Sequence, residues 1–306
     1  MASNPTPDNA DVLRALADRM ADGCHTHEAA IGILQNTEAA LRAAITALSN
    51  AETQAGLKKT AVSAAYDALQ AQDDAGFTCI NNCKLRLRQV LGERWSAAWE
   101  PTGFPGQSTA VPEKADVRFT LLDALKNYFT AVPASENAGM GATAALCSAA
   151  WTAISDARQA VANAESEQTT AFETRTAATD ALRKRVRGLI NELETLIAVD
   201  DPRWEAFGLN MPANPSAPEP VLSLTAAALG SGRVEVSWTY AVRATRYRVE
   251  SFITGVDVAW QSKVNAKDLE VILKNYTAGQ EVKLRVVACN DGGEAAPSPE
   301  AQVTVV

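Results

Sequence analysis

Two groups of residues in this sequence have the side chains and the spacing of metal ligands. Cys79 and Cys83 stand four residues apart, which places both thiols on one face of a helix. The segment Cys24–His27 adds one thiol and two imidazoles. Four such donors would make a tetrahedral zinc site if their helices met. The spacing is no established zinc signature, however, and buried thiols often fill small gaps in a core. We favour the second interpretation, so no metal and no cofactor are predicted.

A second pattern, Gly139-Met-Gly141-Ala-Thr-Ala144, has the letters of a dinucleotide-binding loop. Such a loop works between a strand and a helix, where its glycines let a pyrophosphate reach the helix N-terminus. Here residues 121–129 before it have helical periodicity, so we expect a loop that leads into a helix. The sequence also lacks the His-Glu-x-x-His, Gly-x-Ser-x-Gly and Walker patterns. No catalytic residue is predicted, and we expect a protein that is not an enzyme.

Tryptophans are the remaining candidates. Trp95, Trp99 and Trp204 are large apolar side chains in an Ala-rich region. Exposed tryptophans often dominate the energy of a protein contact, so these three are candidate protein-contact residues. The alternative, which we favour, is packing within or between helical units.

Composition and charge limit the partners. The net charge of −8 and the pI near 5.0 argue against nucleic acid as the main partner. The basic run 183–187 is followed at once by acidic residues and is interpreted as a solvated helix face. No apolar run is long enough for a membrane span, and no Sec-type signal peptide is visible. Five scattered cysteines fit a reducing cytoplasm, although export without a cleaved signal stays open.

The helical region contains an internal repeat. Ala10-Asp11-Val12 recurs as Ala115-Asp116-Val117, and Asn50-Ala51-Glu52 recurs as Asn163-Ala164-Glu165. Each copy closes on an Arg-Trp pair, at Arg94-Trp95 and at Arg203-Trp204. Several matches in the same order predict a duplication. The expected domains are a tail at 1–9, helical repeats at 10–113 and 114–209 packed as one bundle, a Pro-rich linker at 210–217, and a last domain at 218–306.

Each repeat carries apolar residues at steps of three and four, as in Leu182, Val186 and Leu189, which is typical of a coiled-coil-like seam. The middles, about 50–60 and 163–171, lack large apolar residues. Each long segment is therefore either an antiparallel hairpin with its tip there or one continuous helix. The scarcity of helix breakers slightly favours one helix, which at about 55 residues would reach roughly 80 Å.

After the linker the apolar residues alternate, as in Val234, Val236 and Trp238, and short strands with turn signals between them indicate an antiparallel sandwich. The segments Gly232–Trp238, Ala244–Glu250 and Val286–Gly293 resemble fibronectin type III strands with their core tryptophan, core tyrosine and Ala-x-Asn ending. The sequence departs from that family at Val282, where the corner tyrosine usually stands; Tyr276 is the candidate substitute. The combination of modules is similar to bacterial proteins that carry one terminal fibronectin type III domain.

The fold class predicted is multi-domain α plus β: an elongated antiparallel helical bundle from two tandem repeats, followed by a fibronectin type III-like antiparallel β-sandwich. The resemblance implies architecture and a bacterial origin. The function expected is that of a non-enzymatic structural or protein-interaction protein, whose partner is another protein or a second copy, and which polymerises or is displayed on a particle or appendage. The alternative is a carbohydrate-associated accessory module of a secreted system.

Overall fold

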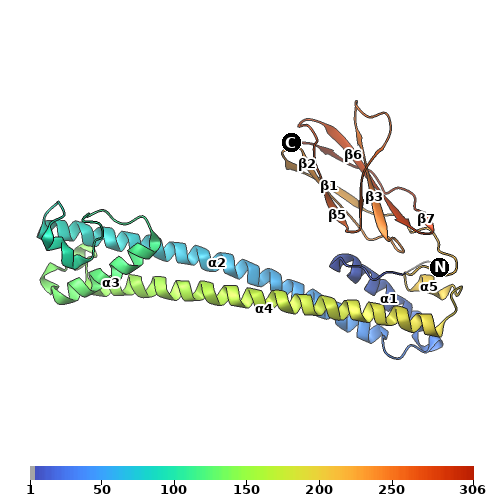
Figure 1. Ribbon diagram of the computed structural model, residues 1–306, viewed down its shortest axis with the longest axis horizontal. Helices are drawn as coiled ribbons and strands as arrows, with labels where there is room; N and C mark the ends of the chain where they lie inside the picture. The colour runs from blue at the N-terminus through green and yellow to red at the C-terminus, as the bar shows by residue number, and fades with distance from the viewer. Residues whose placement is uncertain (1–3) are drawn as a thin grey trace. The chain divides into compact units, whose positions relative to one another are not determined.

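A computed structural model describes residues 4–306, so the first three residues of the expected tail lie outside the described part. The chain is helical at first and forms antiparallel strands at its end, which confirms the α plus β class (Figure 1). The α-helices are α1 (Ala10–Ile31), α2 (Glu38–Leu91), α3 (Ala115–Ala131), α4 (Ala144–Leu196) and α5 (Arg203–Ala206), with short 3-10 helices η1 (Ala97–Thr102), η2 (Pro133–Ser135) and η3 (Ala138–Met140). Over the described residues, every helix is too short or too polar to cross a membrane.

The two long segments are continuous helices, of 54 residues in α2 and 53 residues in α4. The single-helix alternative is therefore confirmed, and the hairpin alternative is wrong. The middle of α2 stays helical because it contains no proline and buries small side chains, Ala51 and Ala55. Polar pairs take the place of a large apolar seam there. Lys58 Nζ, for example, lies 2.7 Å from the Glu167 carboxylate.

The described chain divides into two compact units whose limits fall inside the long helices. The helical unit is Glu52–Thr174, and the sandwich unit comprises the residues before and after it. Each unit thus contains the start of one long helix and the end of the other, packed antiparallel. These limits do not coincide with the expected repeats 10–113 and 114–209, and the duplication itself stays a prediction.

In the sandwich unit, α1 begins at a side-chain cap. The Asn9 Oδ1 accepts the backbone N–H groups of Asp11 and Val12, and α1 ends where Gly32 adopts a left-handed φ of 87°. The apolar face of α1 packs on the start of α2 and the end of α4. The buried residues of this core include Leu13, Leu16, Met20, Leu41, Leu48, Leu182, Val186, Leu189, Leu193, Trp204 and Phe207.

Glu192 on α4 holds the loop that leads into α2. Its carboxylate accepts the backbone N–H groups of Leu34 at 2.8 Å, Gln35 at 3.2 Å and Asn36 at 3.2 Å, together with the Asn36 side-chain amide at 3.0 Å. Successive N–H groups turned to one side form an anion-binding concavity, so one carboxylate satisfies several donors that have no helical partner.

The helical unit has its own core, in which α3 packs on the end of α2 and the start of α4. The buried residues of this core include Ile80, Cys83, Leu87, Trp99, Phe104, Leu121, Leu122, Leu125, Phe129, Cys147 and Ile154. A buried ion pair joins α3 to α2: the Arg118 guanidinium contacts the Asp73 carboxylate, with side chains that are 12% and 10% exposed.

The last part of the sandwich unit is a two-sheet antiparallel sandwich. The strands are β1 (Leu224–Gly230), β2 (Arg233–Trp238), β3 (Arg246–Ile253), β4 (Gln261–Ala266), β5 (Glu270–Leu273), β6 (Glu281–Asn290), β7 (Gly293–Glu294) and β8 (Ala301–Thr304). One sheet has the order β1-β2-β5; in the other, β4-β3-β6-β7 is joined by β8 pairing with β6. Alternate residues of β2, β3 and β6 share one core.

The structure confirms the expected strands β2, β3 and β6, and it adds β1 and β4, which the sequence did not predict. The core tryptophan and tyrosine, Trp238 and Tyr247, lie with ring centroids 5.6 Å apart. Val282 is fully buried in this core, and Tyr276 is also a buried member of it. The Tyr247 hydroxyl accepts the backbone N–H of Ala241 at 3.1 Å, and burial raises the pKa of Tyr247 to about 12.

The linker is held against the sandwich rather than running free. The buried Asn290 side chain donates to Ser216 O and to Arg243 O, both at 2.9 Å. In the turn after it, Gly292 approaches the linker so closely that an added Cβ would lie 2.5 Å from Pro215 O. A turn with this approach needs glycine, which explains the Asn-Asp-Gly-Gly sequence.

Candidate functional site

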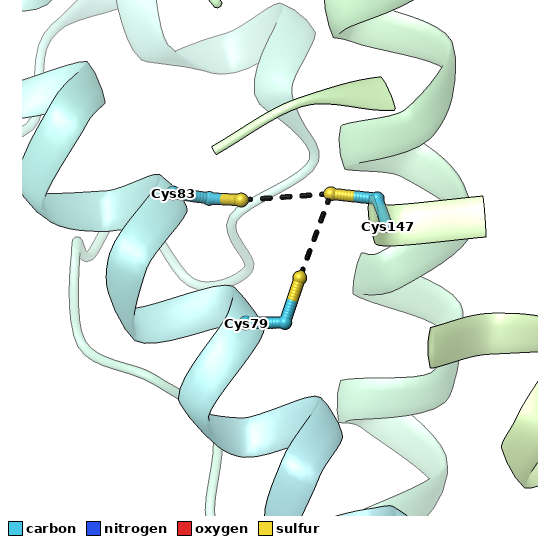
Figure 2. Close-up of side chains that lie close together, drawn as sticks. All are labelled: Cys79, Cys83 and Cys147. Atoms are coloured by element: carbon cyan, nitrogen blue, oxygen red, sulfur yellow. Dashed lines mark hydrogen bonds between the residues drawn. The ribbon is translucent and has the colours of Figure 1, made fainter. Parts of the chain in front are cut away.

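Three thiols meet in the core of the helical unit. Cys79 and Cys83 lie one turn apart on α2, and both point toward Cys147 in the first turn of α4 (Figure 2). The Sγ atoms of Cys83 and Cys147 are 3.5 Å apart, and those of Cys79 and Cys147 are 4.0 Å apart. All three sulfur atoms lie within 4.8 Å of one another. Among the described residues, these are the three cysteines that cluster; Cys24 and Cys289 do not belong to the group.

The elements around the cluster fix the position of Cys147. The Glu136 carboxylate accepts the Ala144 N–H at 2.7 Å, and the Thr143 hydroxyl accepts the Leu146 N–H at 3.2 Å. These contacts define the start of α4 in the way that N-terminal caps do. Cys83 and Cys147 are fully buried, whereas Cys79 keeps part of its surface exposed.

The three thiols do not ionise alike. Hydrogen bonds from Cys147 and from Cys83 lower the pKa of Cys79, because they stabilise its thiolate. Hydrogen bonding within the cluster, first from Cys147, raises the pKa of Cys83, and burial raises it further. The pKa of Cys147 is also raised, chiefly through its hydrogen bond with Cys79.

The cysteines and histidines considered in the sequence fall into different groups. Cys24 lies in the core of the sandwich unit, where its thiol donates to Asn36 O at 3.6 Å. In the same unit, His25 pairs with Glu38 at 3.0 Å and His27 packs near Phe207. Neither histidine belongs to the cluster formed by Cys79 and Cys83. The third member is Cys147, which the sequence did not single out.

Only the antiparallel pairing of the long helices brings Cys147 to that place. The start of α4 lies against the end of α2 in the helical unit, so residues 64 and 68 positions apart become neighbours. The segment Gly139–Ala144 before it is a loop that leads into α4, as expected. It contains η3 and a left-handed Gly141 rather than the strand that a dinucleotide site needs.

The tryptophan candidates are packing residues in two of three cases. Trp99 and Trp204 have no exposed surface, so a partner could not reach them, and the protein-contact interpretation is corrected for both. Each indole N–H donates to a carbonyl just beyond a long helix, from Trp99 to Gly92 O at 3.2 Å and from Trp204 to Ala198 O at 2.9 Å. Trp95 is partly exposed and stays a candidate.

The structure also changes which tryptophans correspond to each other at the ends of the two repeats. The sequence match places Trp95 opposite Trp204, but the buried donor at the end of α2 is Trp99. An aromatic residue follows each of the two buried tryptophans: the Phe104 ring meets Trp99 edge-on at 5.6 Å, and Phe207 lies three residues after Trp204.

The sandwich offers a different kind of site, an ordered apolar loop between β3 and β4. Val258 is 99% exposed and Val256 is 66% exposed. The Asp257 carboxylate accepts the Ile253 N–H at 2.7 Å, and the backbone N–H groups of Val256 and Asp257 bond to Ile253 O. The loop therefore holds its shape while two apolar side chains point to solvent. At its base, Arg285 lies 4.3 Å from the ring centroid of Trp260.

Comparisons with known proteins reach only the sandwich. No protein-family model matches the chain, and no curated protein matches it. Among solved structures, the titin kinase with its flanking domains is 21% identical over 29% of this chain and 17% of that chain, with a TM-score of 0.28. FN3tt is 14% identical over 29% of this chain and 96% of that chain, with a TM-score of 0.27. The FN5 domain of Drosophila Lar is 18% identical over 29% and 97%, with a TM-score of 0.26. The first of these matches spans about a sixth of the solved chain's length. The C-terminal part of this chain is thus similar to fibronectin type III domains.

Proposed function

We propose that this protein is a non-enzymatic structural or protein-interaction protein, and that the β3–β4 loop of its sandwich makes the contact. The observation that supports this most directly is the exposure of Val256 and Val258 on a loop that its own hydrogen bonds keep in one shape. An apolar side chain on an ordered loop binds with little loss of conformational entropy. Scattered exposed apolar residues are common, but two on one ordered tip favour a contact.

The helical part has a supporting role in this proposal. Within the sandwich unit, the N-terminal residues bond to the linker, as Asn4 does to Asn210, and to the β-sandwich, as Asn9 does to Asp268. A sandwich that is held in this way presents its loop in a defined direction from its unit. Such presentation suits assembly of many copies, or display on a particle or an appendage, and we propose a second copy as the first partner to test.

The test uses the full chain and two matched sets of variants. Val256→Asp with Val258→Asp places charges on the loop, whereas Val306→Asp places one on another exposed valine of the sandwich. Size-exclusion chromatography with light scattering and negative-stain microscopy would follow assembly over a range of concentrations. We expect the wild type and Val306→Asp to associate and the loop variant to remain monomeric.

A photo-crosslinking residue at position 258 extends this test to a different protein partner, with position 306 as its control. A wild-type protein that stays monomeric and forms no position-specific crosslink would contradict the proposal. A glycan array that retained the wild type and released the loop variant would favour the carbohydrate-associated alternative instead.

A further inference from the structure

The cluster of Cys79, Cys83 and Cys147 has the spacing of metal-bound thiolates. Metal–sulfur bonds of about 2.3 Å in tetrahedral zinc sites place neighbouring sulfur atoms about 3.8 Å apart. The distances from Cys147 Sγ, 3.5 Å to Cys83 and 4.0 Å to Cys79, lie on either side of that value. The third edge, from Cys79 to Cys83, is within 4.8 Å, so the three sulfurs approximate one face of a coordination tetrahedron.

Rigid elements hold these donors. Cys79 and Cys83 lie well inside a continuous helix of 54 residues, and the Glu136 and Thr143 contacts define the turn that carries Cys147. Sites built on helices keep their donors in place better than sites on loops. A thiol that only fills a gap needs no second or third thiol beside it, because alanine or leucine would pack an apolar core equally well.

Charge favours a cation at the same point. The Glu136 carboxylate accepts the Ala144 N–H at 2.7 Å, three residues before Cys147, so negative charge lies close to the three sulfur atoms. A bound metal ion would take up the charge of all three thiolates, since a coordinating thiol is deprotonated by the ion.

The donor set selects the class of ion. Thiolates prefer soft ions such as Zn²⁺ and Cu⁺. No histidine or carboxylate of the described chain joins the three sulfurs within ligand distance. Zn²⁺ would therefore need a small molecule such as water at its fourth position, whereas Cu⁺ is satisfied by three sulfurs.

From these observations we infer that Cys79, Cys83 and Cys147 bind one thiophilic metal ion through three thiolates. The site is independent of the protein contact proposed above, because it lies in the core of the helical unit. Its structural effect would be to tie the end of α2 to the start of α4.

The experiment uses the full chain, reduced and stripped of metal. Co²⁺ serves as a spectroscopic probe, because thiolate ligation produces sulfur-to-cobalt charge-transfer bands in the near ultraviolet. Zn²⁺ is then titrated in competition with a chromophoric chelator, and Cu⁺ is titrated anaerobically against a Cu⁺ chelator. We expect saturation at one equivalent with charge-transfer bands that Zn²⁺ or Cu⁺ abolishes; the tighter of these two ions identifies the class.

The variants assign the site. Cys147→Ala removes the thiol that joins the other two, and Cys24→Ala removes a single buried thiol from the other unit. Replacing a residue that only hydrogen-bonds to a metal-binding side chain already lowers the affinity for the metal about 10–100-fold. We therefore expect at least a tenfold loss in Cys147→Ala and an unchanged affinity in Cys24→Ala. Circular dichroism establishes that each variant is helical; if Cys147→Ala does not fold, Cys79→Ala at the partly exposed position replaces it.

Two results would overturn the inference. One is a reduced wild-type protein that gives no charge-transfer band with Co²⁺ and binds neither Zn²⁺ nor Cu⁺ at one equivalent. The other is metal binding that the cluster variants and Cys24→Ala change equally.

Discussion

The Asn290 side chain donates to the Asn210 side-chain oxygen at 3.1 Å, across 80 positions of the sequence. Asn290 ends β6 and is 3% exposed, and Asn210 lies at the start of the linker. The oxygen of the Asn290 amide accepts the Gly292 N–H at 2.7 Å. One buried amide thus joins the two ends of the linker, the segment between β2 and β3, and the turn after β6.

Replacing Asn290 should therefore destabilise the sandwich unit. Asn290→Ala leaves several buried acceptors and one N–H without a partner, at about 1–3 kcal/mol each before the site relaxes. Asn290→Asp should cost more, because a carboxylate would face the carbonyl oxygens of Ser216 and Arg243. Urea denaturation would measure both losses. Asn265→Ala, on the exposed side of β4, is the control and should change the free energy of unfolding by less than about 0.5 kcal/mol.

The Glu192 contacts predict a loss of stability in acid. Burial opposes ionisation of Glu192, but hydrogen bonds from Leu34, Asn36 and Gln35 outweigh it and lower its pKa below the ordinary value of 4.5. A group whose pKa is lowered by folding stabilises the folded state above its unfolded pKa. This contribution is lost as the pH falls through 4.5 and then through the lower pKa of the folded state.

Glu192→Gln should consequently be less stable than the wild type at neutral pH by about 1–2 kcal/mol, as for the loss of a helix cap. The difference should shrink as the pH falls below 4.5, because the wild-type carboxylate then becomes protonated too. Denaturation curves at neutral and acidic pH would show this convergence. Glu194→Gln, exposed on the same helix, is the control; a difference for Glu192→Gln that is equal at both pH values would contradict the prediction.

The buried ion pair of the helical unit predicts a strong asymmetry between single and double variants. Arg118→Ala leaves the Asp73 carboxylate buried without its partner, which should cost about 3–5 kcal/mol. Adding Asp73→Ala should recover part of that loss, because no buried charge then remains. Lys58→Ala breaks a pair whose side chains are 38% and 58% exposed and should cost at most about 1 kcal/mol. Thermal and chemical denaturation of these three variants and of Asp73→Ala would test the order; additive losses for Arg118→Ala and Asp73→Ala would contradict it.

The buried tryptophans should contribute through packing and through one hydrogen bond each. Trp204→Ala and Trp99→Ala each remove a fully buried ring and should cost about 3–5 kcal/mol. Trp204→Phe keeps most of the packing but loses the bond to Ala198 O, at about 1 kcal/mol.

Trp95→Phe is the matched control, because the Trp95 indole nitrogen has no hydrogen-bond partner among the described residues. It should be close to neutral in chemical denaturation. If Trp95→Phe destabilised the protein as much as Trp204→Phe, the prediction would be contradicted. Trp95, as the sequence match suggests, would then be the residue equivalent to Trp204.

Local patterns were sufficient for much of the architecture. The spacing of Leu182, Val186 and Leu189 predicted the buried face of α4, and the alternation around Trp238 predicted β2. Such periodicities work because a helix and a strand each turn their side chains by a constant angle per residue. Ala-rich β1 and mostly exposed β4 were missed, since neither alternates large apolar and polar residues.

The sites depended on contacts that no local pattern contains. The sequence by itself determined that Cys79 and Cys83 share a helix face, and that a fibronectin type III-like sandwich follows a helical region. Only the tertiary structure decided that Cys147 completes the pair, that Trp99 and Trp204 are enclosed, and that Val256 and Val258 are not. The physical reason is that antiparallel packing brings the start of one long helix to the end of the other. Which residues then touch depends on helix length and on the register of packing, and not on their neighbours in the chain.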